Sequence, residues 1–116
     1  MSRRTDRVGD AIHHAIAEML LREIKDPRIG MVTVTAVEVS PDLHLARVFF
    51  SVIGDESARA RSLAGLESAR GYIRGRLFRQ LKLRVAPEVQ FEFDPSFERA
   101  ETVSRLLRGE HEDADE

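Results

Sequence analysis

Three short segments of the chain alternate apolar and polar residues, which is the pattern of strands with one buried face. They are residues 31–39, 45–53 and 88–94. The alternation is cleanest in the last, where Val89, Phe91 and Phe93 point one way and acidic or amide side chains point the other. Because only one face of each strand is apolar, we expect helices to cover one side of the sheet and leave the other side polar.

The first two strands are predicted to form an antiparallel hairpin, because only a short turn sequence, Ser40-Pro41-Asp42, separates them. On the first strand we expect Val32, Val34 and Ala36 to share the apolar face. Phe49 falls on the polar face of the second strand and is the exception to its pattern.

Two longer segments have apolar residues at steps of three and four, the spacing of amphipathic helices. The first is predicted to begin with Thr5 as its N-cap and to end at Asp26-Pro27, because the residue before a proline avoids the α region. The second begins at Gly54-Asp55 and contains three glycines, at positions 65, 71 and 75. Each glycine costs about 1 kcal/mol in a helix interior relative to alanine, so we expect a break in this helix and place it at Gly71.

The predicted elements are, in order, helix, strand, strand, broken helix, strand, and a short last helix from Asp94-Pro95 to near Gly109. A right-handed crossover from the second strand through the broken helix would lay the third strand parallel beside it. These rules predict one two-layer α+β domain, residues 1–109, with a mixed three-stranded sheet and residues 45–53 as its central strand. Residues 110–116 contain five acids and no base, and we expect them to be a disordered tail.

Positive charge is concentrated in one stretch of the chain. The net charge is −2, but residues 59–84 contain eight basic residues and a single acid, Glu67. A break at Gly71 would place small residues and the exposed amides of a helix start within this stretch, where an anion is favoured. Guanidinium and ammonium groups suit phosphate, so we interpret the stretch as an RNA-binding surface rather than a solvated helix face.

We predict the RNA-contacting residues from this stretch and from two segments outside it. The set is Arg7, Arg28, Ala69, Arg70, Gly71, Tyr72, Arg74, Arg76, Arg79, Lys82 and Arg84. For Tyr72, stacking on a base and packing against the sheet both remain open. Asp26 and Pro27 are better explained as a helix stop, and Arg3 and Arg4 as part of an N-terminal arm that either contacts RNA or is disordered.

The sequence offers no catalytic, metal or cofactor site that we can assign. It has no cysteine, no Gly-x-x-x-x-Gly-Lys loop and no histidine pair at helical spacing, since His13 and His14 are adjacent. Asp26, Asp42 and Asp94 each stand next to a proline, which favours caps and turns over the metal ligands of a nuclease. No run approaches the ~18 apolar residues that span a bilayer, so we expect a cytoplasmic protein. We also expect it to be a non-catalytic monomer without a cofactor.

Several short motifs occur in an order that resembles one known family. They are Arg7-Val8, Lys25-Asp26-Pro27-Arg28, Val37-Glu38-Val39-Ser40-Pro41-Asp42-Leu43, Ala69-Arg70-Gly71-Tyr72-Ile73-Arg74, Leu83-Arg84, Pro87-Glu88-Val89-Gln90-Phe91 and Phe93-Asp94. The topology and the helix break resemble a type II KH domain, in which a Gly-x-x-Gly loop clamps nucleic-acid backbone. Here Ala69-Arg70-Gly71 stands in place of that loop, as in the ribosome-binding factor A family, and the resemblance covers about residues 3–108.

The resemblance implies a KH-like fold and a non-catalytic factor for late maturation of the bacterial small ribosomal subunit. Members of this family bind the 16S rRNA precursor, aid processing of its 5′ end and support growth after cold shock. The expected partners are therefore 16S rRNA and free 30S subunits, with ribosomal proteins and other assembly factors as further partners, and no membrane. Because the Gly-x-x-Gly loop is absent, we expect binding by shape and phosphate rather than by base sequence.

Two other functions remain to be distinguished from RNA binding. A protein–protein adaptor would use the acidic tail and the first helix. An RNA-processing nuclease would need metal-dependent cleavage of precursor rRNA, and we expect no such cleavage.

Overall fold

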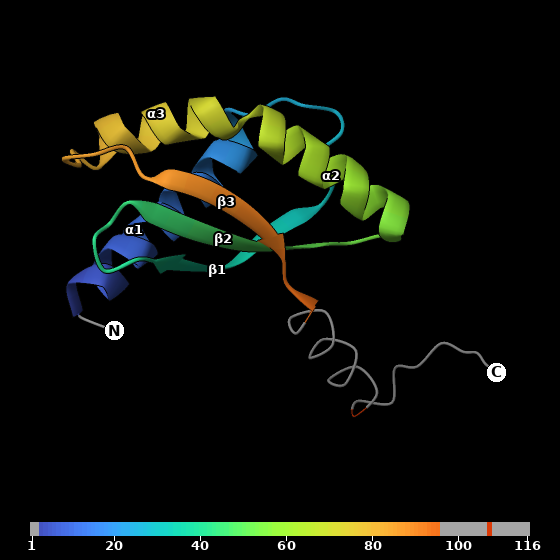
Figure 1. Ribbon diagram of the computed structural model, residues 1–116. Helices are drawn as coiled ribbons and strands as arrows, with labels where there is room; N and C mark the ends of the chain where they lie inside the picture. Colours follow the sequence, from blue (N-terminus) through green and yellow to red (C-terminus); the bar gives the residue numbers. More distant parts are fainter. Residues whose placement is uncertain (1–2, 96–106, 108–116) are drawn as a thin grey trace.

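Residues 3–95 and residue 107 are described by the computed structural model shown in Figure 1. Their elements, in chain order, are α1 (Arg3–Arg22), β1 (Val32–Val39), β2 (Leu45–Val52), α2 (Glu56–Ser68), α3 (Arg70–Gln80) and β3 (Glu88–Phe93). β1 pairs antiparallel with β2, and β2 pairs parallel with β3, so β2 is the central strand. The predicted mixed sheet, its strand order and its parallel crossover are confirmed.

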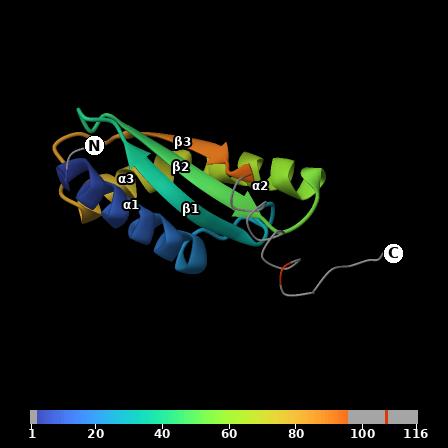
Figure 2. The ribbon, with the colours of Figure 1, turned by 90° about the horizontal axis from the view of Figure 1, so that it is seen from below.

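The helices cover one face of this sheet. Helix α1 packs along its β1 side, while α2 and α3 lie along β2 and β3 (Figure 1, Figure 2). The core lies between the two layers. Its most deeply buried side chains include Ile12, Ile16, Met19, Val48, Phe50, Leu66, Ile73, Leu77 and Val89. All belong to the apolar stripes of the sequence, so burying these stripes holds the two predicted layers together.

A β-bulge in β1 changes the predicted face of Ala36. Val34 pairs with Phe50, but the next pair is Ala36 with Phe49, so Thr35 is an extra residue on β1. Because the side-chain period of a strand is two, one inserted residue moves Ala36 to the face opposite the core. The expectation that Ala36 lies on the apolar face is therefore wrong.

The polar face of the sheet carries a network around Arg47, on the central strand. The Arg47 guanidinium donates to both carboxylate oxygens of Glu92, at 3.0 and 2.9 Å, and lies 3.4 Å from a carboxylate oxygen of Glu38. It also lies over the ring of Phe49, 5.1 Å from the centroid, which explains the aromatic residue on this face. Because two acids surround Arg47, this network offers RNA phosphate no uncompensated cation.

Helix α1 begins earlier than predicted, at Arg3, and ends at Arg22. Thr5 lies inside the helix with only 5% of its surface exposed, so its prediction as the N-cap is wrong. Arg3 and Arg4, expected in an N-terminal arm, belong instead to the first turn of the helix. The helix stops before Asp26-Pro27, as the proline requires.

The break between α2 and α3 lies at Ala69, and its placement at Gly71 is wrong. The Ala69 N–H donates to the carbonyls of Gly65 and Leu66, both at 3.1 Å, which closes α2. The Ala69 carbonyl accepts from the Ile73 N–H at 2.9 Å, which opens α3. Gly71 then lies in the first turn of α3, where N–H groups have no partner within the helix and glycine is best tolerated.

Glycine is favoured at two other helical positions because another segment comes close. A Cβ on Gly65 would lie 2.6 Å from Cγ1 of Ile29, so the loop between α1 and β1 could not pack against α2 as it does. A Cβ on Gly9 would lie 3.1 Å from the carbonyl oxygen of Val37, where α1 crosses β1. These glycines therefore mark contacts between elements rather than helix breaks.

Three predictions concern the C-terminal part of the chain. Most of the helix expected from Asp94-Pro95 to near Gly109, and all of the acidic tail 110–116, lie outside the described residues, so both stay predictions, as does the domain boundary at 109. Among the described helices, none is long and apolar enough to cross a membrane.

Candidate nucleic-acid interface

The predicted RNA-contacting residues fall into two groups along α3. The group nearer the helix break, which we call the kink cluster, consists of Arg28, Ala69, Arg70, Gly71, Tyr72, Arg74 and Arg76. The group nearer the other end of α3, which we call the end group, consists of Arg7, Arg79, Lys82 and Arg84. With 11 residues and a rise of about 1.5 Å per residue, α3 separates its two ends by about 16 Å.

Arg76 and Tyr72 of the kink cluster both bond to one carboxylate, that of Glu23 just after α1. The Arg76 guanidinium donates to its two oxygens at 3.0 and 2.8 Å, and the Tyr72 hydroxyl donates to one of them. Hydrogen bonds from Arg76 and, less strongly, from Tyr72 lower the pKa of Glu23 to about 2. With 48% of its surface exposed, Tyr72 is not packed against the sheet, so that alternative is wrong.

Arg28 is held in a similar way on the other side of the break. Its guanidinium donates to the two carboxylate oxygens of Asp26 at 3.0 and 2.6 Å, and to the hydroxyl of Ser68 at 2.9 Å. Oδ1 of Asp26 also accepts from the Arg28 backbone N–H at 2.9 Å, so Asp26 forms the turn predicted for it. These bonds from Arg28 lower the pKa of Asp26 to about 2. The loop after α1 is thus fastened to both α2 and α3.

Arg74 fastens α3 to the loop that leads into β3. Its Nε donates to the carbonyl of Pro87 at 3.0 Å, and its Nη2 donates to the carbonyl of Ala86 at 3.1 Å. Arg28, Arg74 and Arg76 therefore all direct donors to oxygens of their own chain. A phosphate at these residues would have to compete with those oxygens.

The outer surface of the kink is more open, at Arg70 and Gly71. Arg70 has an ion pair with Glu67 at 3.1 Å, between side chains that are 42% and 41% exposed. Exposed pairs of this kind contribute little free energy, so Arg70 can exchange Glu67 for a phosphate at small cost. A Cβ on Gly71 would meet no atom of the described chain within 4 Å, which leaves space for an external backbone to approach.

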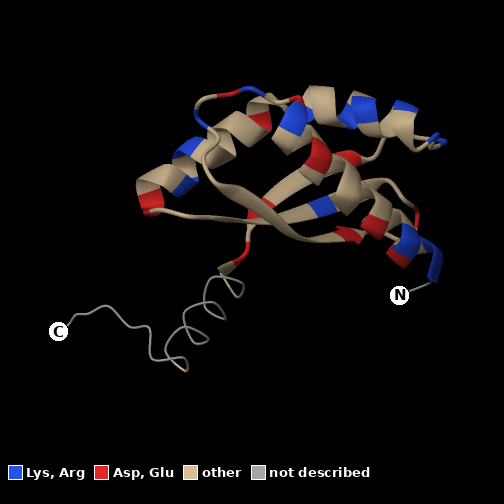
Figure 3. Cartoon of the chain, turned by 180° about the vertical axis from the view of Figure 1, so that it is seen from behind, with Lys and Arg blue, Asp and Glu red and all other residues tan. Residues whose placement is uncertain are grey.

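The cations of the end group differ from those of the kink cluster. Arg7, Arg79, Lys82 and Arg84 are exposed, and within the described part of the chain none of them has an ion pair. Figure 3 shows basic residues on α3, in the loop after it and at the start of α1, toward the same end of the molecule. An anion arriving at this end meets no carboxylate already bonded to these cations.

Lys82 has an unusual backbone conformation. Helix α3 closes with the long hydrogen bond of a Schellman end, in which the Leu83 N–H donates to the Phe78 carbonyl at 3.3 Å. Lys82 stands between them at the position where glycine is usual, and its φ of 52° is left-handed. Such a conformation costs an L-residue roughly 1–2 kcal/mol, yet the chain places a cation there.

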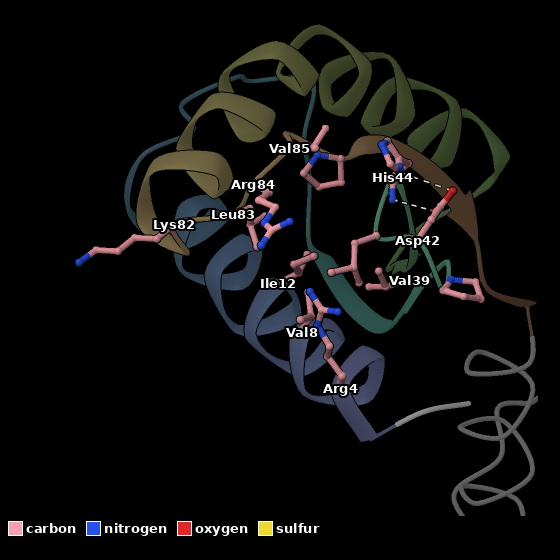
Figure 4. A pocket seen from close by; sticks show the side chains of 13 residues that line it. Arg4, Val8, Ile12, Val39, Asp42, His44, Lys82, Leu83, Arg84 and Val85 are labelled. Atoms are coloured by element: carbon pink, nitrogen blue, oxygen red, sulfur yellow. Dashed lines mark hydrogen bonds and ion pairs between the residues drawn. The ribbon is translucent and has the colours of Figure 1, made fainter.

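A cleft of about 470 Å³, which we call the end cleft, opens beside the end group (Figure 4). Its walls come from the start of α1, the β1–β2 turn and the loop between α3 and β3. Apolar side chains form most of it, and its polar residues are Arg4, Asp42, His44, Lys82 and Arg84. A second hollow of about 340 Å³ shares Arg4, Val8 and Leu83 with the cleft, and Arg7 lines it.

Sequence reasoning did not find this cleft and left the role of Arg4 open. The sequence does contain a signal, because Arg3, Arg4 and Arg7 form a basic start to the chain. No local pattern, however, indicates that the first turn of α1 and residues 82–87 line the same cleft. That meeting depends on how α1 and α3 pack on the same face of the sheet.

Comparison with known proteins supports a single family. A family model described as ribosome-binding factor A matches residues 4–107. Ribosome-binding factor A of Trichlorobacter lovleyi is 50% identical over 106 residues, which cover 91% of this chain and 86% of that protein. The matched range contains every residue of the kink cluster, the end group and the end cleft.

Solved structures give the same result for the fold. A Thermotoga maritima protein described as a proposed ribosome binding factor A is 31% identical, with a TM-score of 0.71, and the match covers 79% of this chain and 88% of that chain. A homology model of Thermus thermophilus ribosome binding factor A, as fitted into a cryo-electron microscopy map of its 30S complex, has a TM-score of 0.64. At 24% identity, with 78% of this chain and 96% of that chain covered, the second likeness is one of fold. The expected KH-like α+β fold is confirmed.

Proposed function

Because the chain belongs to the ribosome-binding factor A family, we propose that it is a non-catalytic assembly factor that binds the small (30S) ribosomal subunit and its 16S rRNA precursor. It acts in late maturation, including processing of the 5′ end of 16S rRNA, and supports adaptation to cold shock. It works in the cytoplasm as a monomer, without a cofactor. Its fold is compatible with this partner, since a Thermus thermophilus protein of the same fold is placed in a 30S complex.

The observation that carries this proposal is the series of exposed cations along α3 and the loop after it. Arg70, Arg79, Lys82 and Arg84 contact phosphates directly in this proposal, and Arg7 extends the series onto α1. Ala69 and Gly71 keep the outer surface of the kink small enough for an RNA backbone to approach. Binding of this kind depends on charge and shape, so the affinity should fall steeply as salt rises.

The remaining residues of the kink cluster have a positioning role in this proposal. Arg28, Tyr72, Arg74 and Arg76 hold the kink and the neighbouring loops through bonds to their own chain. They therefore fix the spacing of the exposed cations rather than bind phosphate. A surface of fixed shape can bind immature rRNA more tightly than mature rRNA, and this difference in affinity shifts the population toward the bound conformation.

Co-sedimentation with free 30S subunits tests the proposal. Exchanging Arg70→Glu together with Arg79→Glu should weaken binding by about tenfold or more, because two phosphate contacts become repulsive. Arg70 has only its exposed ion pair with Glu67 of α2, and Arg79 has no ion pair among the described residues, so the variant should lose little stability. The matched control is Arg22→Glu with Arg61→Glu, which changes the net charge equally at exposed positions of α1 and α2. Equal losses in the two variants, or no loss in either, would show that this surface is not the RNA site.

A protein–protein adaptor is the second candidate, and one observation favours it. Leu21, Met31 and Ile53 are 71%, 69% and 75% exposed, around an apolar hollow of about 570 Å³ between α1 and β1. Exposed apolar patches of this kind are common at protein interfaces. An adaptor should lose its partner when Leu21→Ser and Ile53→Ser are combined, or when residues 110–116 are deleted. The RNA-binding proposal expects both variants to co-sediment with 30S subunits as before.

A nuclease is the third candidate. Among the described residues, no group of three or more histidines, cysteines or acids is placed to hold a metal ion. Incubating the purified protein with precursor 16S rRNA and Mg²⁺ tests the point directly. We expect intact RNA, and metal-dependent cleavage that disappears in the Arg70→Glu, Arg79→Glu variant would contradict the non-catalytic assignment.

A further inference from the structure

We propose that the end cleft holds one unpaired nucleotide of RNA, with its phosphate between Arg4 and Arg84 and its base against the apolar wall. This inference rests on the proposed function in one respect, namely that the partner is RNA. It adds a binding site for a single nucleotide that phosphate contacts along α3 do not require.

Two guanidinium groups converge at this cleft. Figure 4 shows the side chain of Arg4, from the first turn of α1, and that of Arg84, from the loop before β3, directed toward one another, while Lys82 extends outward beside them. Within the described residues neither arginine has an ion pair. Two like charges repel across such a gap, and an anion placed between them replaces that repulsion with two attractive contacts.

One acid lines the cleft, but its carboxylate is already bonded elsewhere. Oδ1 of Asp42 accepts from the Ser40 hydroxyl at 2.7 Å and from the His44 backbone N–H at 3.0 Å, and Oδ2 lies 3.4 Å from Nδ1 of His44. Figure 4 shows Asp42 and His44 together, away from the two arginines. Asp42 therefore closes the β1–β2 turn and does not neutralise Arg4 or Arg84.

Two of these cations, Arg4 and Lys82, occupy positions in the chain where they lower the stability of the fold. Arg4 lies in the first turn of α1, at the positive end of the helix dipole, where a cation is unfavourable. Lys82 occupies the left-handed position at the end of α3, where glycine would relieve the strain. Neither placement stabilises the fold, so binding an anion is the role that accounts for both.

The apolar wall favours a base over a bare phosphate. It includes Val8, Leu83, Val85 and Pro87, and Val85 is 44% exposed although it is apolar. A cleft of about 470 Å³ has the size of small-molecule sites, which suits one base with its phosphate. Bases of a duplex are stacked and paired, so they cannot enter it. The occupant is therefore an unpaired nucleotide.

The test measures fluorescence anisotropy of a labelled RNA octamer of uridine at increasing salt. The variant Arg4→Gln with Arg84→Gln should bind it about tenfold more weakly, and the slope of log K against log salt should fall by about 1.4, since two contacts to a single strand are lost. The matched control, Arg22→Gln with Arg61→Gln, should stay within about twofold of the wild type. The cleft variant should melt at the same temperature as the wild type or higher, because Arg4 opposes the helix dipole.

A second probe separates the base from the phosphate. An octamer of abasic ribose phosphates has the charge of the uridine octamer without its bases. If the cleft holds a nucleotide, the wild type binds the abasic octamer more weakly, and the Arg4→Gln, Arg84→Gln variant binds the two octamers equally. Equal binding of the two octamers by the wild type overturns the inference, as does an equal loss of affinity in the cleft variant and its control.

The inference and the proposed function can fail separately. Co-sedimentation of the wild type with 30S subunits decides the proposed function and does not depend on the octamer. If the wild type co-sediments but does not discriminate between the octamers, the cleft inference is wrong and the proposed function stands. If the wild type does not co-sediment, the proposed function is wrong, whatever the octamers show.

Discussion

Arg76 and Arg84 belong to the same basic stretch of the sequence, yet Arg76 faces a carboxylate of its own chain and Arg84 does not. Arg76 joins α3 to Glu23 through two hydrogen bonds, at 3.0 and 2.8 Å. Arg84 points into the end cleft toward another cation, Arg4 (Figure 4). The kink cluster is therefore largely satisfied within the protein, whereas the end group and the end cleft retain their charge for a partner.

This difference follows from what the two regions must do. At the kink, two helices meet at Ala69 and a loop passes close to Gly65, so polar bonds from Arg28, Arg74 and Arg76 add to the apolar packing between these elements. At the end cleft, the β1–β2 turn is closed by Asp42 instead. Cations there are not needed to hold the fold. Local charge density alone therefore overestimates how many arginines bind RNA.

The largest expected effect tests the comparison on a single helix, α3, which carries both a bonded and an unbonded arginine. Arg74→Ala removes a charged donor from the carbonyls of Pro87 and Ala86, and should lower the free energy of unfolding by about 2 kcal/mol. Arg79→Ala, on the same helix but without such bonds, should change it by less than about 0.5 kcal/mol. Urea denaturation measures both.

The same pair of variants separates the two roles in binding. Arg79→Ala should weaken co-sedimentation with 30S subunits while its stability stays unchanged. Arg74→Ala should weaken binding only together with its loss of stability, because Arg74 holds the loop before β3 and does not contact RNA in this proposal. If Arg74→Ala is fully stable but no longer binds, Arg74 contacts RNA directly and its positioning role is wrong.

The sequence predicts the layers of this fold well because the layers depend on local periodicity. The alternation in residues 88–94 and the apolar steps in α1 identify the core face without knowledge of the partner element. The bulge at Thr35 was not predicted, since a single inserted residue leaves the composition of a strand unchanged. The position of the break was missed by two residues because glycine marks a weak helix position, whereas hydrogen bonds decide where the helix ends.

The site is less accessible to sequence reasoning, because its chemistry depends on contacts between distant residues. Glu23 and Arg76 are far apart in sequence, and nothing in either segment indicates that they meet. The basic stretch indicates a surface rich in cations, but the sequence does not sort its arginines into bonded and unbonded ones, and RNA binding by the stretch stays a prediction. Arg4 shows a second case, since its basic neighbours Arg3 and Arg7 mark it as a candidate and only the packing of α1 brings it to the cleft.

A smaller effect is expected at Lys82. Lys82→Gly removes the left-handed strain at the end of α3 and should raise the free energy of unfolding by about 1 kcal/mol, measured by urea denaturation. The same variant should bind the uridine octamer more weakly, because a cation beside the end cleft is lost. If Lys82→Gly stabilises the fold and weakens binding, Lys82 has the opposite role to Arg74, which stabilises the fold and does not contact RNA. If Lys82→Gly is destabilising, the lysine supports the fold through its side chain and belongs with the kink cluster.

The smallest effect is expected from pH, through the two acids that are bonded to the kink cluster. Folding lowers the pKa values of Glu23 and Asp26 to about 2, from ordinary values of about 4.5 and 3.8. A lowered pKa means that the unfolded chain binds protons more readily, so the stabilisation is complete above about pH 5 and is lost as the pH falls toward about 2. Both carboxylates are only partly buried, so the melting temperature should fall by only a few degrees from this cause.

The variant Glu23→Gln with Asp26→Asn isolates the effect from other titrating groups. At neutral pH it should melt below the wild type, and the two melting curves should converge as the pH approaches about 2, because the wild-type carboxylates are then protonated. High salt should reduce the difference, since exposed ion pairs are screened. A difference that persists unchanged at low pH would mean that the two acids stabilise the kink as neutral hydrogen-bond acceptors. In that case the contrast between the kink cluster and the end cleft would lie in hydrogen bonding rather than in charge.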